Sequence, residues 1–169
     1  MYQEAPLITM YARILDNLTG EELLSFTDVK DNKTWYYGKC NSLEGGESQY
    51  IIEFDIWNNE LSFNAGTYDT RCKDALNCKF ELNIDANSEL AKIQPSFMYA
   101  RCLTNGFEEF IPIKNNNKLN ISGNVCPNSN ILKGNGDHAI VQTKIVLPEG
   151  SNIKIDRYSF NFKLCYDYD

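Results

Sequence analysis

The sequence predicts an all-β protein, an antiparallel β-sandwich or jelly roll of about ten short strands. Three observations lead to this prediction. Hydrophobic and polar residues alternate along much of the chain, helical periodicity is nearly absent, and short segments rich in Gly, Asn, Asp, Ser and Pro separate the apolar runs. With 169 residues, 43% of them hydrophobic, the chain has the size of a single domain spanning residues 1–169.

Three segments show the alternation most clearly, and each predicts a strand with one side in the core. They are "QYIIEFDIW" (49–57), "CKFELNID" (78–85) and "YSFNFKLCYDYD" (158–169). In the first, Glu53, Asp55 and Trp57 fall on the side expected to face solvent. Six inward residues are predicted to be buried together: Phe54, Ile56, Phe80, Leu82, Phe160 and Phe162.

Further strands are expected at 7–15, 23–29, 33–40, 96–104, 108–114, 118–125 and 138–147. A helical turn or two is expected only in "DTRCKDAL" (69–76) or "ANSELAK" (86–92).

Two copies of a short motif raise the question of an internal repeat. "MYARIL" at 10–15 returns as "MYARCL" at 98–103, and the same shift lays 50–57 over 138–145. A duplication and a shared packing solution both explain this. In either case Met and Ala share one face of each strand, and Tyr and Arg share the other, with Arg13 and Arg101 as candidate interface anchors.

Charge and composition exclude several classes of partner. Sixteen Lys and Arg stand against 23 Asp and Glu, for a net charge of −7, and no basic stripe is present. Binding to nucleic acid or to an anionic membrane surface is therefore not expected. The N-terminus lacks the pattern of a signal peptide and no window has the apolar length of a membrane span, which indicates a cytoplasmic protein.

The six cysteines leave the compartment open. As cysteines of a secreted protein they would form three bridges, and in a cytoplasm they would be thiols. Thiols are favoured because several cysteines lie within predicted strands as small core residues. The six cysteines of the chain are Cys40, Cys72, Cys78, Cys102, Cys126 and Cys165. Their spacing completes no zinc ligand set, and no nucleotide or calcium motif occurs, so we expect neither metal nor cofactor.

Catalytic arrangements are not evident. His138 is the single histidine, it opens a predicted strand after "GNGD", and we expect it to flank a turn. "IIEFDIWNNE" resembles the E-x-D-x-E strand of laminarinase-like glycoside hydrolases, with Glu53 and Asp55 at the first two acidic positions. Trp57 occupies the place of the proton donor, so we expect no catalysis there, and sugar stacking on Trp57 is the remaining glycan-binding interpretation.

Four segments resemble small virion proteins of tailed bacteriophages of low-GC Gram-positive hosts. They are "LLSFTDVKDNKTWYYGKC", "IIEFDIWNNELSFNAG", "FMYARCLT" and "DHAIVQTKIVLPEG". The resemblance implies a non-enzymatic β module of a tail, baseplate or capsid decoration, made in the host cytoplasm without a signal peptide. Its partners would be copies of itself and other virion proteins, with a surface glycan as a further partner class.

Exposed aromatic and Arg side chains are the expected anchors of such an interface, which we expect to bury on the order of 800 Å² per partner. The candidates are Trp57, Glu53, Asp55, Arg101, Arg13, Tyr166 and Tyr168. A secreted, disulfide-bonded ligand-binding sandwich of the viral immune-evasion type is an alternative, since "FKLCYDYD" resembles the strand-plus-cysteine ends of that group. A carbohydrate-binding module is another.

Overall fold

The computed structural model describes residues 4–31, 35–40, 44–66, 71–106, 109–114, 117–151, 153, 158 and 160–169. Within them the strands are β1 (Ile8–Asp16), β2 (Glu22–Asp28), β3 (Gly46–Glu47), β4 (Tyr50–Asn58), β5 (Leu76–Asn83), β6 (Met98–Cys102), β7 (Ile111–Ile113), β8 (Leu119–Asn120), β9 (Asp137–Leu147) and β10 (Asn161–Asp167). The helices are α1 (Glu60–Ala65) and the single 3₁₀ turn η2 (Leu90–Lys92). None of these helices has the length and hydrophobicity needed to cross a bilayer.

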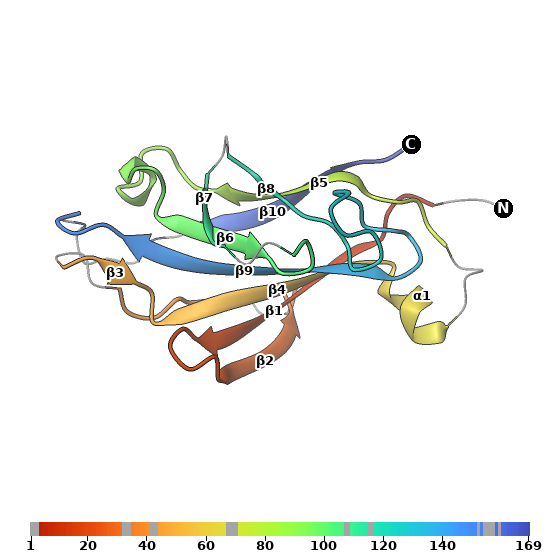
Figure 1. Ribbon diagram of the computed structural model, residues 1–169, viewed down its shortest axis with the longest axis horizontal. Coiled ribbons are helices and arrows are strands. Elements are labelled where there is room, and N and C mark those ends of the chain that lie inside the picture. Colours follow the sequence, from red (N-terminus) through yellow and green to blue (C-terminus); the bar gives the residue numbers. More distant parts are fainter. Residues whose placement is uncertain are drawn as a thin grey trace.

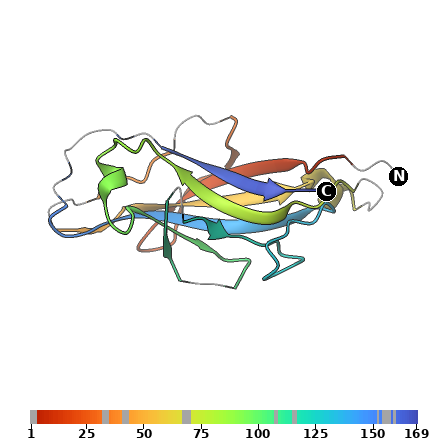
Figure 2. The ribbon, with the colours of Figure 1, turned by 90° about the horizontal axis from the view of Figure 1, so that it is seen from above.

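The strands form two antiparallel sheets that pack face to face. The large sheet has the order β2-β1-β4-β9-β6-β7, with β3 also paired to β9, and the small sheet has the order β10-β5-β8. Figure 1 shows β5, β8 and β10 as a layer over the long strands β9, β4 and β1, and Figure 2 shows the same layering from above. The prediction of an all-β sandwich is confirmed.

The core lies between the two sheets. Phe54 and Ile56 of β4 and Phe80 and Leu82 of β5 are buried there, as predicted. Phe162 is only partly buried, but its ring stacks on Phe80 at a centroid distance of 5.0 Å. Phe160 is likewise partly buried and packs against the same cluster. The alternation in the sequence therefore identified the core faces of both sheets.

The predicted strand at 33–40 is wrong over its described part, residues 35–40, which contain no strand. Gly38 has a φ of 74°, which interrupts the extended backbone, although Tyr37 and Lys39 still accept backbone hydrogen bonds from Tyr50 and Gln49. The strands expected at 96–104 and 118–125 are shorter than predicted, at Met98–Cys102 and Leu119–Asn120.

Helical turns occur partly where they were expected. η2 lies in "ANSELAK", whereas "DTRCKDAL" forms no helix over its described residues because its end joins β5. α1 was not predicted. It lies between Asn59 and Gly66, which are both in the left-handed conformation, and it covers one end of the large sheet (Figure 1).

The repeated motif occupies equivalent places in the large sheet. β1 and β6 carry the two copies, and they flank the central strands β4 and β9 on opposite sides. Each is followed in the chain by a hairpin partner, β2 or β7, that forms the nearer edge of the sheet. Counted from either edge, the sheet therefore has the hairpin partner first, the strand with the motif second and a central strand, β4 or β9, third. Ala and Arg lie on opposite faces of each strand, as predicted, and the structure shows that Ala12 and Ala100 face the core.

Both edges of the large sheet have features that discourage the addition of another strand. The pairing of β2 with β1 is interrupted by two register shifts, and β7 is only three residues long with Pro112 at its centre. Bulges and edge prolines remove the regular row of free backbone groups that strand addition requires. Contacts with other molecules are therefore expected at the faces and ends of the sandwich.

Candidate functional site

A row of four polar side chains crosses the outer face of the large sheet, the face that points away from the core. Arg13, Glu53, Gln142 and Arg101 are paired in register on β1, β4, β9 and β6. Arg13 Nε donates to Glu53 Oε2 at 2.6 Å, and Gln142 Nε2 donates to Glu53 Oε1 at 2.8 Å. Gln142 Oε1 accepts from Arg101 Nε at 2.9 Å and from its Nη2 at 2.7 Å. We call these four residues the polar row.

An aromatic ring covers the arginine at each end of the polar row. The guanidinium of Arg13 lies 4.7 Å from the ring centroid of Phe26, and that of Arg101 lies 4.4 Å from the centroid of Phe110. Arg13 also pairs with Glu22 on the edge strand, at 2.8 Å. These contacts fix both guanidinium groups at the two ends of the polar row.

The prediction that Glu53 and Trp57 face solvent is wrong. Glu53 is only 2% exposed and Trp57 9% exposed. β4 is a central strand, so long side chains from both neighbouring strands cover this face of it. Both carboxylate oxygens of Glu53 are hydrogen bonded, which satisfies a buried charge that would otherwise be costly.

Trp57 and His138 form a stacked pair next to the polar row. Their ring centroids are 4.2 Å apart, with an interplanar angle of 12°. His138 Nδ1 lies 2.7 Å from Asp55 Oδ1, and the hydrogen bond to this carboxylate raises the pKa of the imidazole above its ordinary value. His138 does follow a turn, as predicted, but its side chain also joins β9 to Asp55 of β4.

Helix α1 is fixed on top of this pair. The ring of Phe63 lies 5.3 Å from that of Trp57, and Gly136 packs so closely on the Phe63 backbone that a Cβ atom there would lie 2.5 Å from Phe63 Cβ. Asn59, at the start of the helix, donates from Nδ2 to the carbonyl of Gly134 at 2.8 Å. The helix is therefore held by the "GNGD" loop that precedes β9.

The same loop is held by a buried carboxylate. Asp137 is 1% exposed, its Oδ1 accepts from the backbone N–H groups of Val125 and His138, and its Oδ2 accepts from that of Lys133. Three such bonds satisfy the charge within the chain. "GNGD" is thus a structural clamp for this end of the sandwich.

Two side chains of α1 remain exposed on this fixed support. Leu61 is 78% exposed and Phe63 62% exposed. Leu7 is also exposed, and its carbonyl accepts the backbone N–H of Asn59 beside the helix. We call Leu7, Leu61 and Phe63 the apolar end.

The structure divides the predicted interface residues into two groups. Trp57, Glu53, Asp55, Arg101 and Arg13 lie together on the outer face of the large sheet. Tyr166 lies in β10 of the small sheet and packs against the core, and Tyr168 follows this strand and is 52% exposed beneath Lys73.

Sequence reasoning missed Gln142, Phe63 and the role of His138. The available signals were "WNNE" and "GNGDH", whose polar residues fasten the same end of the sandwich from two distant segments. In the part of the chain that the structure describes, no three His, Cys, Asp or Glu side chains are grouped to hold a metal ion. Comparisons of the chain with models of protein families, with curated proteins and with solved structures found no match.

Proposed function

We propose that this protein is a non-enzymatic assembly module that acts through protein–protein interfaces. The observation that carries the proposal is the apolar end, where Leu61 and Phe63 are exposed on a helix that is rigidly held. Fixed, exposed apolar side chains bind a partner without a large ordering cost, and interface anchors typically have this character.

The polar row supports a structural role for the carboxylates of β4. Both oxygens of Glu53 are engaged by Arg13 and Gln142, and Asp55 is engaged by His138. A carboxylate that acts as an acid or nucleophile must reach a substrate, and Glu53 is buried beneath its neighbours. The network instead stiffens the sheet that carries the apolar end.

Sugar stacking on Trp57 has less support. His138 covers the indole in a stacked arrangement, Phe63 lies against it as well, and little of the ring is exposed. A pyranose needs an open aromatic face, which Trp57 does not offer. Protein partners are therefore preferred to a glycan.

The virion is the proposed setting, and its support is the resemblance of four segments to phage virion proteins. Partners would then be further copies of this chain and neighbouring virion proteins. Proteomic analysis of purified particles from the source strain tests this setting. We expect the chain at a fixed stoichiometry to the major virion proteins, and its absence from intact particles would refute the virion assignment.

The assembly role is tested by analytical ultracentrifugation of the purified chain, alone and with virion components. Wild-type protein is expected to associate, and Phe63→Ser is expected to weaken association because it removes part of the apolar end. Leu18→Ser is the matched control, since Leu18 is 97% exposed in a turn outside this patch. A strictly monomeric chain that binds no particle component would contradict the proposal.

A further inference from the structure

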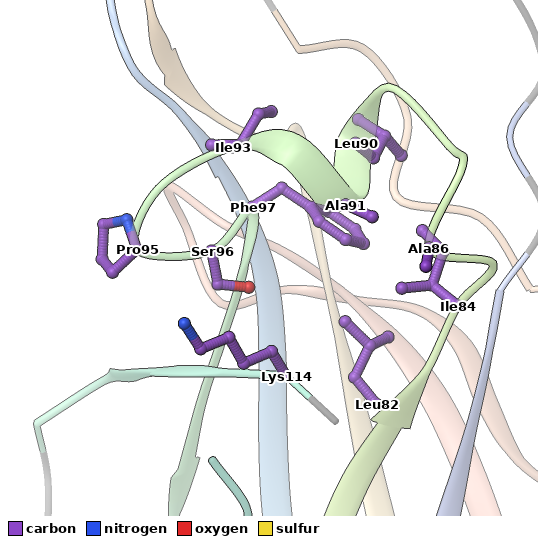
Figure 3. Close-up of a pocket in the computed structure, with 10 residues that line it drawn as sticks. All are labelled: Leu82, Ile84, Ala86, Leu90, Ala91, Ile93, Pro95, Ser96, Phe97 and Lys114. Atoms are coloured by element: carbon purple, nitrogen blue, oxygen red, sulfur yellow. The ribbon is translucent and has the colours of Figure 1, made fainter. Parts of the chain in front are cut away.

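An apolar pocket opens at one end of the sandwich, between the end of β5 and the start of β6 (Figure 3). Its volume is about 190 Å³. It is lined by Leu82, Ile84, Ala86, Leu90, Ala91, Ile93, Pro95, Ser96, Phe97 and Lys114. The inner wall is formed by buried Leu82, Leu90 and Phe97, whereas Ala86 and Lys114 are exposed near the opening.

The pocket suits one apolar side chain accompanied by a negative charge. An apolar protein cavity of about 150 Å³ is large enough to bind benzene, so this pocket can hold a leucine side chain, which has fewer carbons. Ser96 Oγ is already occupied, since it donates to Ile113 O and accepts from Met98 N. Lys114 carries the only charge among the lining residues, and it favours an acidic neighbour in the occupant.

The chain itself presents such a side chain at its opposite end. Figures 1 and 2 both show η2, which forms part of the pocket, and α1 at opposite ends of the long axis. Leu61 is more exposed than Phe63 on α1, and it is preceded by Glu60, a half-buried carboxylate whose Oε2 accepts a hydrogen bond from the hydroxyl of Tyr11. The pocket and Leu61 cannot meet within one molecule, but they can meet between two.

We propose that the pocket receives Leu61 of a second copy of this chain, with Glu60 of that copy facing Lys114. This inference rests on the proposed assembly function and names its partner and contact. Because the two complementary surfaces lie at opposite ends, the contact is head-to-tail, and each copy that docks leaves a free pocket at one end and a free Leu61 at the other. Such a contact builds a ring where the rotation closes and a filament where it does not.

Two variants that each disable one side of the contact provide the test. Leu61→Asp removes the apolar side chain and keeps the pocket, and Ala86→Trp fills the opening of the pocket and keeps Leu61. Each variant alone is expected to be monomeric, with self-association weakened roughly ten- to hundred-fold. An equimolar mixture can form one intact junction per pair, and is expected to give dimers and nothing larger in sedimentation velocity.

Lys114→Glu is a second pocket variant that cannot disturb the core, because Lys114 is exposed. It is expected to weaken association by charge repulsion against Glu60, and Leu18→Asp is the control that leaves association unchanged. Association of both single variants at the wild-type level, or a mixture that stays monomeric, would refute the Leu61 contact while leaving the assembly role intact. A wild-type chain that is monomeric yet present in particles also refutes the contact. A wild-type chain that is monomeric and absent from particles refutes the proposed function itself.

Discussion

Asp55 on β4 and His138 on β9 are joined side chain to side chain at 2.7 Å, while the imidazole lies flat on Trp57. The hydrogen bond with Asp55 favours the protonated imidazole, and it outweighs the opposing effect of partial burial. The charge of His138, at this end of the large sheet, therefore changes with pH near neutrality.

We predict that the His138–Asp55 pair stabilises the fold more at acidic than at alkaline pH. The pKa of His138 is raised in the folded state, so this contribution is fully present below the unfolded pKa of about 6.5 and is lost as the pH rises through the folded pKa. NMR titration of the single histidine should give a pKa above 6.5 that falls in Asp55→Asn. Urea unfolding of wild type and His138→Gln between about pH 5.5 and 8.5 measures the difference. An equal difference at both ends of this range would contradict the prediction.

Glu53 should be the most sensitive member of the polar row. Glu53→Ala leaves Arg13 and Gln142 without their shared partner and is expected to cost about 3 kcal/mol of unfolding free energy. Glu22→Gln removes the charge of the more exposed partner of the same arginine and should cost less than about 1 kcal/mol. Chemical denaturation of both variants measures the contrast, and similar losses would show that the buried network is not the stronger support.

Gly136→Ala should loosen the attachment of α1. The residue has a φ of 98°, which costs an alanine roughly 1–2 kcal/mol, and the added Cβ collides with the backbone of Phe63. Gly20→Ala is the matched control, because its φ is 73° but nothing lies within 4 Å of the added atom. The excess destabilisation of Gly136→Ala, with greater solvent quenching of Trp57 fluorescence in a Trp35→Phe background, would report the collision. Equal effects of the two variants would exclude it.

Core truncations should follow burial rather than residue type. Phe80 is fully buried between Phe54 and Phe162, and Phe80→Ala is expected to cost about 3–5 kcal/mol. Phe162→Ala should cost less because that ring is only partly buried. Leu18→Ala, at an exposed position, should stay within about 0.5 kcal/mol. Thermal or urea unfolding tests this order.

All six cysteines are free in the structure, so six thiols should react under denaturing conditions without reductant. In the native protein Cys40, Cys126 and Cys165 should react first, since they are partly exposed. Cys78 should react last because burial raises its pKa to about 11. Titration with a chromogenic disulfide reagent measures both the number of thiols in denaturant and the rates at which they react in the native protein. A count near zero in denaturant would instead favour the secreted, disulfide-bonded alternative.

The core faces could be predicted because alternation is a local property of the chain. Phe54 and Phe80 follow the period of two that any half-buried strand requires, and both are buried. The prediction of a strand at 33–40 is wrong over its described residues. Gly38 has a left-handed backbone there, which interrupts the extended conformation that the surrounding apolar and aromatic residues favour.

The candidate site was only partly predictable because its contacts are long-range. Arg13, Glu53 and Arg101 could be chosen as candidates from their residue types. Their alignment in the polar row depends on which strands become neighbours in the sheet. The burial of Glu53 follows from the central place of β4, which no local pattern reveals. His138 joins Asp55 across a sequence separation of 83 residues, and Phe63 belongs to a helix too short to have a periodic signal.

The order of strands in the large sheet delays the completion of that sheet during synthesis. β4 needs β9 as its second neighbour, yet β9 begins only at Asp137 of a 169-residue chain. At ordinary ribosomal rates the free edge of β4 waits on the order of several seconds for its partner, long enough to meet the same edge on another nascent chain. If two β4 strands paired about the position that Gln142 normally faces, Glu53 would meet a second Glu53, and two like charges directly opposite each other oppose that pairing. A glutamate on one central strand and a glutamine on the other thus favour the pairing of β4 with a β9 strand over the pairing of two β4 strands from neighbouring nascent chains.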